Sequence, residues 1–243
     1  MKKIFTILSI GLLFFSCKDE KTKPESIGTV NVINAVTDAG AIKVNPTGKA
    51  NSWSRLILQT NYAAGTLYYA TTGNANFVIA PISDTTKTLF NRSFNLQAKM
   101  YTLYLSGAVA SPDTMLMEEI NYPFINAFSS SIPTTADSVV NVRFVNLSVG
   151  SPALKVKLST AVSDEVGNLP YKGISPFKAY PARLLSTTYS FEIRRVDNDV
   201  LVTTFNFGAT SANRFKNVAL VIRGIFGTTA APAPFGVSMV NYY

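Results

Sequence analysis

The chain contains no histidine and only one cysteine, Cys17, among its 243 residues. Without histidine it has no Ser-His-Asp or Cys-His catalytic group, and it lacks the imidazole ligands of typical catalytic zinc sites. With one cysteine it forms no disulfide within the chain. These absences exclude the commonest hydrolase mechanisms, and we predict no catalytic residue and no metal site.

Charged residues are also scarce, at 15% of the chain. The formal net charge is +8 and falls to +6 once residues 1–16, with Lys2 and Lys3, are removed. The basic residues are scattered, and Arg194-Arg195 is the only basic doublet after the leader. A nucleic-acid-binding protein would gather such residues in a patch. We therefore predict no nucleic-acid partner.

Hydrophobic residues make up 47% of the chain and aromatic residues 12%, which is enough to bury a core. Thr, Ser, Asn, Val, Phe and Tyr are plentiful, and these residues favour pleated, half-buried strands over helices. The composition predicts an all-β fold.

The first 16 residues have the three parts of an export signal. Lys2 and Lys3 form a basic start, residues 4–15 form an apolar run, and Ser16 is a small residue directly before Cys17. The run is too short for a membrane-spanning helix, which needs about 20 apolar residues. We therefore predict a signal peptide over residues 1–16.

A cysteine at this place resembles the lipobox of bacterial lipoproteins. The resemblance implies that Cys17 becomes the first residue of the mature chain and carries a covalent diacylglycerol and a fatty acid. These acyl chains would hold the protein in a lipid bilayer, since several chains together anchor firmly. The alternative is an ordinary secreted protein with an incidental free thiol.

Lys18, Asp19 and Glu20 follow the cysteine directly. They resemble the export tag of surface-displayed lipoproteins in some Gram-negative bacteria, which implies an outer-membrane protein exposed at the cell surface. The alternative is a plain solvated segment, because residues 17–27 have too few apolar side chains to fold and are predicted as a flexible tether.

Two copies of one unit follow the tether. Residues 30–35 and 41–44 match residues 142–147 and 153–156 at an offset of 112, residues 99–107 match 216–224 at 117, and residues 120–122 match 240–242 at 120. An offset that rises in steps is typical of duplication with loop insertions. We predict domains over residues 28–130 and 131–243, joined through the Ser- and Thr-rich residues 129–135.

Each copy has the pattern of short strands separated by turns. In the second copy Tyr189, Phe191 and Ile193 alternate with polar residues, and Asp197-Asn198-Asp199 supplies turn residues, so residues 188–207 are predicted as a β-hairpin. A calcium loop is the less favoured interpretation of this acidic turn, because the Gly and the distant Glu of an EF-hand are absent. The size and spacing predict two tandem immunoglobulin-like antiparallel β-sandwich domains.

The second copy also resembles a known family. Residues 140–156, 171–177 and 179–182, with the strand that ends at Gly224, are similar to the domain-of-unknown-function family DUF4397. The resemblance covers residues 139–225 and, more faintly, 29–107. It implies a β-sandwich of secreted or surface proteins and brings no catalytic residues with it.

Candidate binding residues are few. Trp53 and the pair Tyr68-Tyr69 are predicted as a stacking platform for a sugar or peptide, although aromatic rings equally pack beneath loops. The predicted function is therefore a non-catalytic module for adhesion, envelope structure or binding of a glycan or protein.

The alternative function is a carboxylate-based, glycan-directed enzyme. Glu118-Glu119 and Asp164-Glu165 are adjacent acidic pairs. Neighbouring residues on a strand face opposite sides, so neither pair alone provides two carboxylates across a cleft. Such an enzyme would have to combine acidic residues from separate strands.

Overall fold

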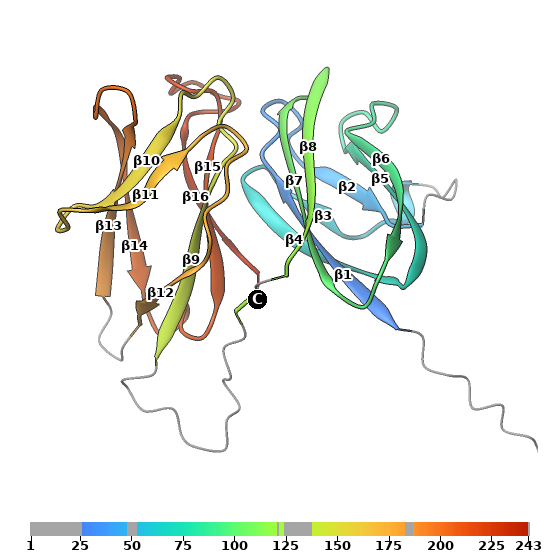
Figure 1. Cartoon of the computed structure of the whole chain (residues 1–243). Coiled ribbons are helices and arrows are strands. Elements are labelled where there is room, and N and C mark those ends of the chain that lie inside the picture. Colours follow the sequence, from blue (N-terminus) through green and yellow to red (C-terminus); the bar gives the residue numbers. More distant parts are fainter. Residues whose placement is uncertain (1–25, 48–52, 121, 124–137, 183–186, 243) are drawn as a thin grey trace, which may run out of the picture.

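The computed structural model describes residues 26–47, 53–120, 122–123, 138–182 and 187–242. This part of the chain is all-β apart from one 3-10 turn, η1 (Trp53–Arg55), and its strands form two β-sandwiches that lie side by side (Figure 1). The strands of the first sandwich are β1 (Ile27–Asn34), β2 (Ile42–Asn45), β3 (Gln59–Thr60), β4 (Ala64–Thr71), β5 (Gly73–Pro81), β6 (Phe90–Leu96), β7 (Met100–Ala108) and β8 (Ser111–Glu118). Those of the second are β9 (Val139–Asn146), β10 (Leu154–Leu158), β11 (Asp164–Leu169), β12 (Lys178–Pro181), β13 (Thr187–Arg195), β14 (Leu201–Ala209), β15 (Asn217–Arg223) and β16 (Gly236–Asn241).

Both sandwiches have the same topology. The first pairs the sheets β4-β1-β7-β8 and β3-β2-β5-β6, and the second pairs β12-β9-β15-β16 and β11-β10-β13-β14. The sheets are mostly antiparallel, but β1 runs parallel to β7 and β9 runs parallel to β15. The predicted two tandem β-sandwich domains are confirmed. The parallel pairs arise because the first strand of each copy joins the sheet beside a late strand that runs the same way.

The strand registers follow the offsets found in the sequence. Thr29 of β1 lies opposite Met100 of β7 in the first sandwich. A shift of 112 residues turns Thr29 into Asn141, and a shift of 117 turns Met100 into Asn217. These two residues lie opposite each other in the second sandwich. The third offset, 120, was wrong. Met117 lies opposite Thr102 whereas Val240 lies opposite Ala219, so the last strands are related by a shift of 123.

The predicted hairpin of residues 188–207 is confirmed as β13 and β14, which pair antiparallel. Along β13, Phe191 and Ile193 are fully buried while Glu192 and Arg194 lie partly exposed on the other face. The turn contains Asp199 with φ 57°, and the backbone N–H of Val200 donates to Asn198 Oδ1 at 3.1 Å. The period-two pattern and the turn residues therefore define this element locally.

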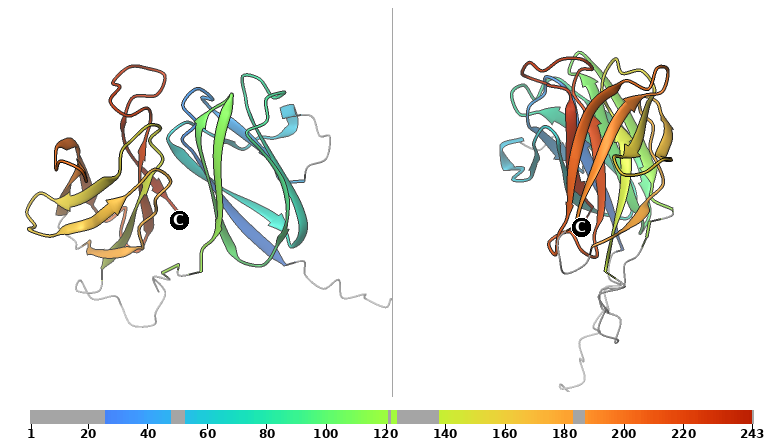
Figure 2. Two further views of the ribbon diagram at one scale, coloured as in Figure 1. Left: turned by 45° about the horizontal axis from the view of Figure 1, so that its top comes forward. Right: turned by 90° about the vertical axis from the view of Figure 1, so that its left-hand side faces the viewer.

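Each sandwich has its own core between its two sheets. The first core contains Val30, Val32, Phe77, Ile79 and Leu103, among others, and the second contains Phe144, Phe191, Phe207, Leu220 and Ile222, among others. The strands β7, β9 and β15 are buried on both faces almost throughout, which is unusual for an ordinary antiparallel sandwich with one solvated face. Residues of their outer faces form a buried cluster with the other sandwich. Figure 2 shows the two sandwiches from two further directions.

One fully buried asparagine links the two sheets of each sandwich. Asn34 Nδ2 donates to the carbonyl oxygens of Gly40 (2.9 Å) and Thr60 (3.2 Å), and its Oδ1 accepts from the N–H of Val36 (3.2 Å). These bonds fasten the end of β1 to β3 of the opposite sheet. The side chain thereby replaces backbone partners that the strand loses where it leaves its sheet.

Asn146 occupies the same place in the second sandwich. Its Nδ2 donates to Leu169 O (3.1 Å) and Ser151 Oγ (2.9 Å), and its Oδ1 accepts from the N–H of Ser148 (3.1 Å). The identity of Asn34 and Asn146 in the sequence therefore has a structural cause.

The first described strand of each copy gives the start of its sandwich. The first sandwich begins with Ile27 of β1, one residue inside the predicted tether, and the second begins with Val139 of β9. The predicted linker of residues 129–135 lies outside the described residues.

Candidate functional site

The two sandwiches meet through equivalent sheets, β4-β1-β7-β8 and β12-β9-β15-β16. The contact has an apolar cluster of its own, separate from the two cores. Its buried members are Ile33, Ala35, Tyr104, Tyr122, Val145, Leu147, Ala219, Val221, Val240 and Tyr242. The interface is thus built like a protein core, and it holds the two sandwiches together as one unit.

The interface contacts are reciprocal. Tyr62 and Tyr171 are equivalent, because the residue after each has φ 63° and donates its N–H to Asn34 O or Asn146 O. Tyr62 packs against Arg223 of the second sandwich, with 5.4 Å between guanidinium carbon and ring centre. Tyr171 hydrogen-bonds Ser106 of the first sandwich at 2.8 Å, and Ser106 is the equivalent of Arg223. The two copies therefore approach each other with the same surface, in an approximate two-fold arrangement.

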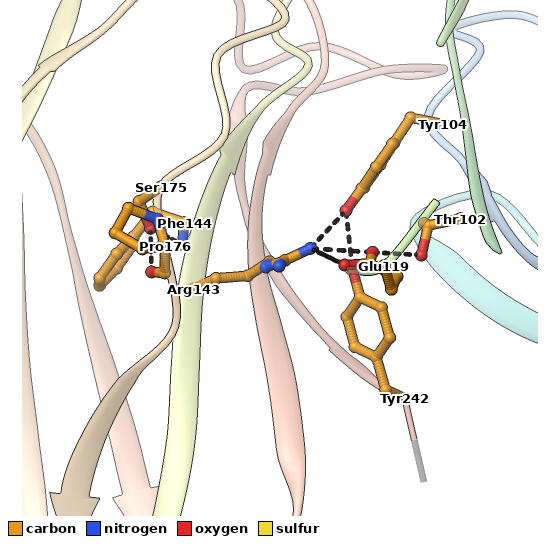
Figure 3. A network of polar contacts seen from close by, with 8 residues as sticks. All are labelled: Thr102, Tyr104, Glu119, Arg143, Phe144, Ser175, Pro176 and Tyr242. Carbon is orange, nitrogen blue, oxygen red and sulfur yellow. Dashed lines mark hydrogen bonds and ion pairs between the residues drawn. The ribbon is translucent and has the colours of Figure 1, made fainter. Parts of the chain in front are cut away.

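A buried ion pair crosses this interface (Figure 3). Arg143 of β9 donates from Nη1 to Glu119 Oε1 (2.9 Å) and Oε2 (3.0 Å), and the two side chains are only 7% and 2% exposed. Glu119 Oε1 also accepts the hydroxyl of Thr102 at 2.6 Å. Charges removed from water in this way are tolerated only when they are paired and hydrogen-bonded.

Two tyrosines complete the network. The hydroxyls of Tyr104 and Tyr242 lie 2.6 Å apart, and each accepts from Arg143 Nη1 at 3.4 Å. Burial raises the pKa of both phenols, that of Tyr104 well above its usual range, so both keep their protons at neutral pH. The guanidinium of Arg143 also lies 3.8 Å from the ring centre of Phe177, a favourable cation–π distance.

The network breaks the two-fold arrangement. The equivalent of Arg143 in the first copy is Asn31, and the strand register makes Tyr242 the equivalent of Glu119. The ion pair therefore forms once, from the second sandwich to the first. Sequence reasoning missed it, because Arg143 was one of many scattered basic residues and Glu119 belonged to an acidic pair with no visible partner.

Gly65 of β4 lies directly against Val240 of the second sandwich. A Cβ at this position would lie 2.5 Å from Val240 Cγ1 and 3.3 Å from Asn31 Oδ1. We expect Gly65→Ala to lower the free energy of unfolding by about 1–3 kcal/mol through overpacking, measured by urea denaturation. Gly167→Ala in β11 is the matched control, since nothing lies within 4 Å of its Cβ. Equal effects of the two substitutions would contradict the close packing.

A pocket of about 440 Å³ opens beside the ion pair, at the junction of the sandwiches. Residues 117–120 of the first sandwich and residues 174–177 of the second form its walls, and Arg143 lines it as well. A second pocket of about 330 Å³ shares residues 174–176 with it and is also lined by Glu165, Lys178 and Tyr180. Both pockets therefore flank the segment that carries the family resemblance.

The carboxylates in these pockets are each paired with a cation. Glu118 pairs with Lys99 (2.7 Å), whereas the next residue, Glu119, pairs with Arg143. Glu165 accepts from Lys178 Nζ and from the hydroxyl of Tyr180, both at 2.6 Å. Burial and the bond to Glu165 raise the pKa of Tyr180, so its phenol remains a donor. Each of these carboxylates therefore has a cationic partner, and none of them is left unpaired as a group for proton transfer.

The predicted aromatic platform is not formed as expected. Tyr68 is 4% exposed, packs in the first core and hydrogen-bonds Thr60 Oγ1 at 3.1 Å, whereas Tyr69 is 61% exposed. The prediction was wrong for Tyr68, because neighbours on strand β4 face opposite sides of the sheet. Trp53 is half-buried in η1, where its carbonyl accepts from Lys43 Nζ at 2.9 Å. The predicted lipidation and export residues Cys17, Lys18, Asp19 and Glu20 lie outside the described residues.

The acidic turn Asp197-Asn198-Asp199 connects β13 to β14, and its carboxylates pair with nearby basic side chains. Asp197 accepts from Arg195, and Asp199 pairs with Lys155 at 2.9 Å. Over the described ranges of the chain, no group of three or more Cys, Asp or Glu side chains is placed to hold a metal ion. Nor do those ranges contain a helix long and apolar enough to cross a membrane.

Comparison of the chain with models of known protein families and with curated proteins gave no match. The resemblance of the second copy to DUF4397 therefore stays a prediction.

Proposed function

We propose that the chain is a lipid-anchored, non-catalytic surface module in which two β-sandwiches act as one rigid unit for binding, adhesion or envelope structure. The observation that carries this proposal is the buried interface. Its apolar cluster and the Arg143–Glu119 pair fix the second sandwich on the first, so that surface features of both are held in a constant relation. Such rigidity suits a displayed recognition surface, because little conformational entropy is lost on binding.

The paired carboxylates support a binding role over a catalytic one. A carboxylate-based glycosidase needs two acidic groups about 5–10 Å apart across a cleft, one of them free to exchange a proton. Glu118 and Glu119 are neighbours in the sequence and have separate cationic partners, and Glu165 is held by Lys178. The absence of histidine from the whole sequence points the same way.

The anchor is tested by metabolic labelling with a fatty acid in intact cells. We expect the full chain to incorporate label and the variant Cys17→Ala to incorporate none, because no other residue offers a thiol. The variant Cys17→Ser serves as a second control, since it keeps the size of the side chain. Label that persists in either variant would contradict the anchor.

Surface display is tested in the same cells by protease shaving. We expect the labelled protein to be digested from outside. Replacement of Lys18, Asp19 and Glu20 together by alanine should leave the label in place while protecting the protein from the protease. Protection of the unaltered chain would place it on the inner side of the membrane and contradict surface display.

A further inference from the structure

Tyr69 points away from the core of the first sandwich. It lies on β4 next to the buried Tyr68, and 61% of its surface is exposed. The fold does not require a ring here. Tyr69 lies opposite Thr29, and the equivalent residue in the second sandwich is Ala179, opposite Asn141. The exposed ring is therefore a feature of one copy alone, as expected for a side chain that serves recognition.

Two hollows of the surface meet at this ring, and both have Tyr69 and Pro46 in their walls. The first has a volume of about 310 Å³ and is mainly apolar. Ile57 and Leu58, which precede β3, form its outer wall with exposures of 92% and 55%. Together with Tyr69, three large apolar side chains are held in water around one hollow, an arrangement that typically marks a binding surface.

The second hollow has a volume of about 400 Å³ and a different lining. Its polar side chains are hydroxyls and amides, and its described walls carry no acidic or basic group. Asn76 Oδ1 is buried there and has no hydrogen-bond partner among the residues that the structure describes. A buried carbonyl oxygen without a partner is rare and marks a place where an added donor would be stabilised. The polar residues of this wall are Thr47, Thr71, Thr72, Asn74 and Asn76.

We propose that these two hollows form one groove that binds a neutral glycan across the ring of Tyr69. A sugar ring has an apolar face of C–H groups, which matches an exposed aromatic ring, and a rim of hydroxyls, which matches a row of amide and hydroxyl side chains. The polar hollow offers no cation to an acidic sugar, since Arg55 of the apolar hollow is the only ionic side chain among the described lining residues of the two.

This inference deepens the proposed binding role but does not depend on the lipid anchor. The test uses the full chain, purified in detergent, on an array of neutral oligosaccharides (β-glucan, α-glucan, mannan and chitin fragments) and anionic ones (polygalacturonate and heparin fragments). Affinities for the glycans that bind are then measured by calorimetry. We expect binding to neutral glycans and none to the anionic set.

Single substitutions locate the site. Tyr69→Ala should weaken binding by about tenfold or more, through loss of ring stacking, while Tyr69→Phe should keep most of the affinity. Asn76→Ala should weaken binding several-fold. Val162→Ala is the matched control, because this apolar residue is 98% exposed on the second sandwich. Unchanged thermal unfolding of Tyr69→Ala shows that the fold is intact.

Three results would overturn the glycan site: no binding to any neutral glycan, binding only to anionic glycans or to peptides, or binding that Tyr69→Ala leaves unchanged. Failure of the anchor has a separate signature. In that case the fatty-acid label would be missing from the full chain while glycan binding by the purified protein persisted.

Discussion

Replacement of Arg143 by alanine is expected to lower the free energy of unfolding by about 3–5 kcal/mol. Most of this loss of stability comes from the Glu119 carboxylate that remains buried, and less from the lost attraction between Arg143 and Glu119. Glu119 is 2% exposed, and without Arg143 its charge would be left in the interface with the hydroxyl of Thr102 as its nearest donor. Urea denaturation monitored by circular dichroism measures the change.

The chain offers a matched control for this prediction. The adjacent Glu118 pairs with Lys99 at the surface, where solvent screens the charges, so Lys99→Ala should change stability little. The double variant with Arg143→Met and Glu119→Leu should recover much of the loss, because it removes both charges and keeps the volume. A double variant as unstable as Arg143→Ala would show that the buried charge is not the cause.

Replacement of Asn146 by alanine is expected to lower the free energy of unfolding by about 2–3 kcal/mol. The buried carbonyl of Leu169 and the N–H of Ser148 would lose the amide that they share, and the second sandwich would lose its link between β9 and β11. Asn146→Asp should be about as damaging, since a carboxylate accepts but does not donate. Urea denaturation gives the free energies, and hydrogen exchange shows which amides lose protection.

The duplication supplies an internal replicate. Asn34→Ala should reproduce the effect in the first sandwich, because its amide makes the equivalent bonds to Thr60 O and Val36 N. Asn198→Ala is the control, as this asparagine accepts a backbone N–H in an exposed turn, where water replaces the lost group. A small effect of both Asn34→Ala and Asn146→Ala would contradict the prediction. It would mean that water hydrogen-bonds the backbone groups that the amides leave, as at Asn198.

Much of the fold was predictable because its signals are local. The alternation along β13, the turn before β14 and the repeated segments define strands and their order within each copy. The parallel pairs were not predictable, since they depend on which distant strand lies beside β1 or β9. The shift of the last strand pair was misjudged because the Asn-Tyr matches at residues 121–122 and 241–242 concealed a difference of three residues in register.

The candidate sites were harder to predict for the same reason. Successive side chains of a strand face opposite sides of the sheet, so Tyr68 and Tyr69 cannot form one platform. The prediction treated the two tyrosines as a pair and overlooked this alternation. Arg143 and Glu119 are 24 residues apart in the chain but belong to different sandwiches. No pattern of residue spacing in the sequence therefore predicts this ion pair. The continuous apolar sequence of β15 was an available sign that this strand is buried on both faces.

The reciprocal packing of the two sandwiches has a consequence for assembly. A surface that is complementary to its own copy would, on a single-domain protein, join two chains into a symmetric dimer. Here both partners belong to one polypeptide, at a mutual concentration that no dilution can lower. The contact is closed, so this face is no longer open to a further molecule of the same chain and cannot propagate into a fibre. Any oligomer must use another surface.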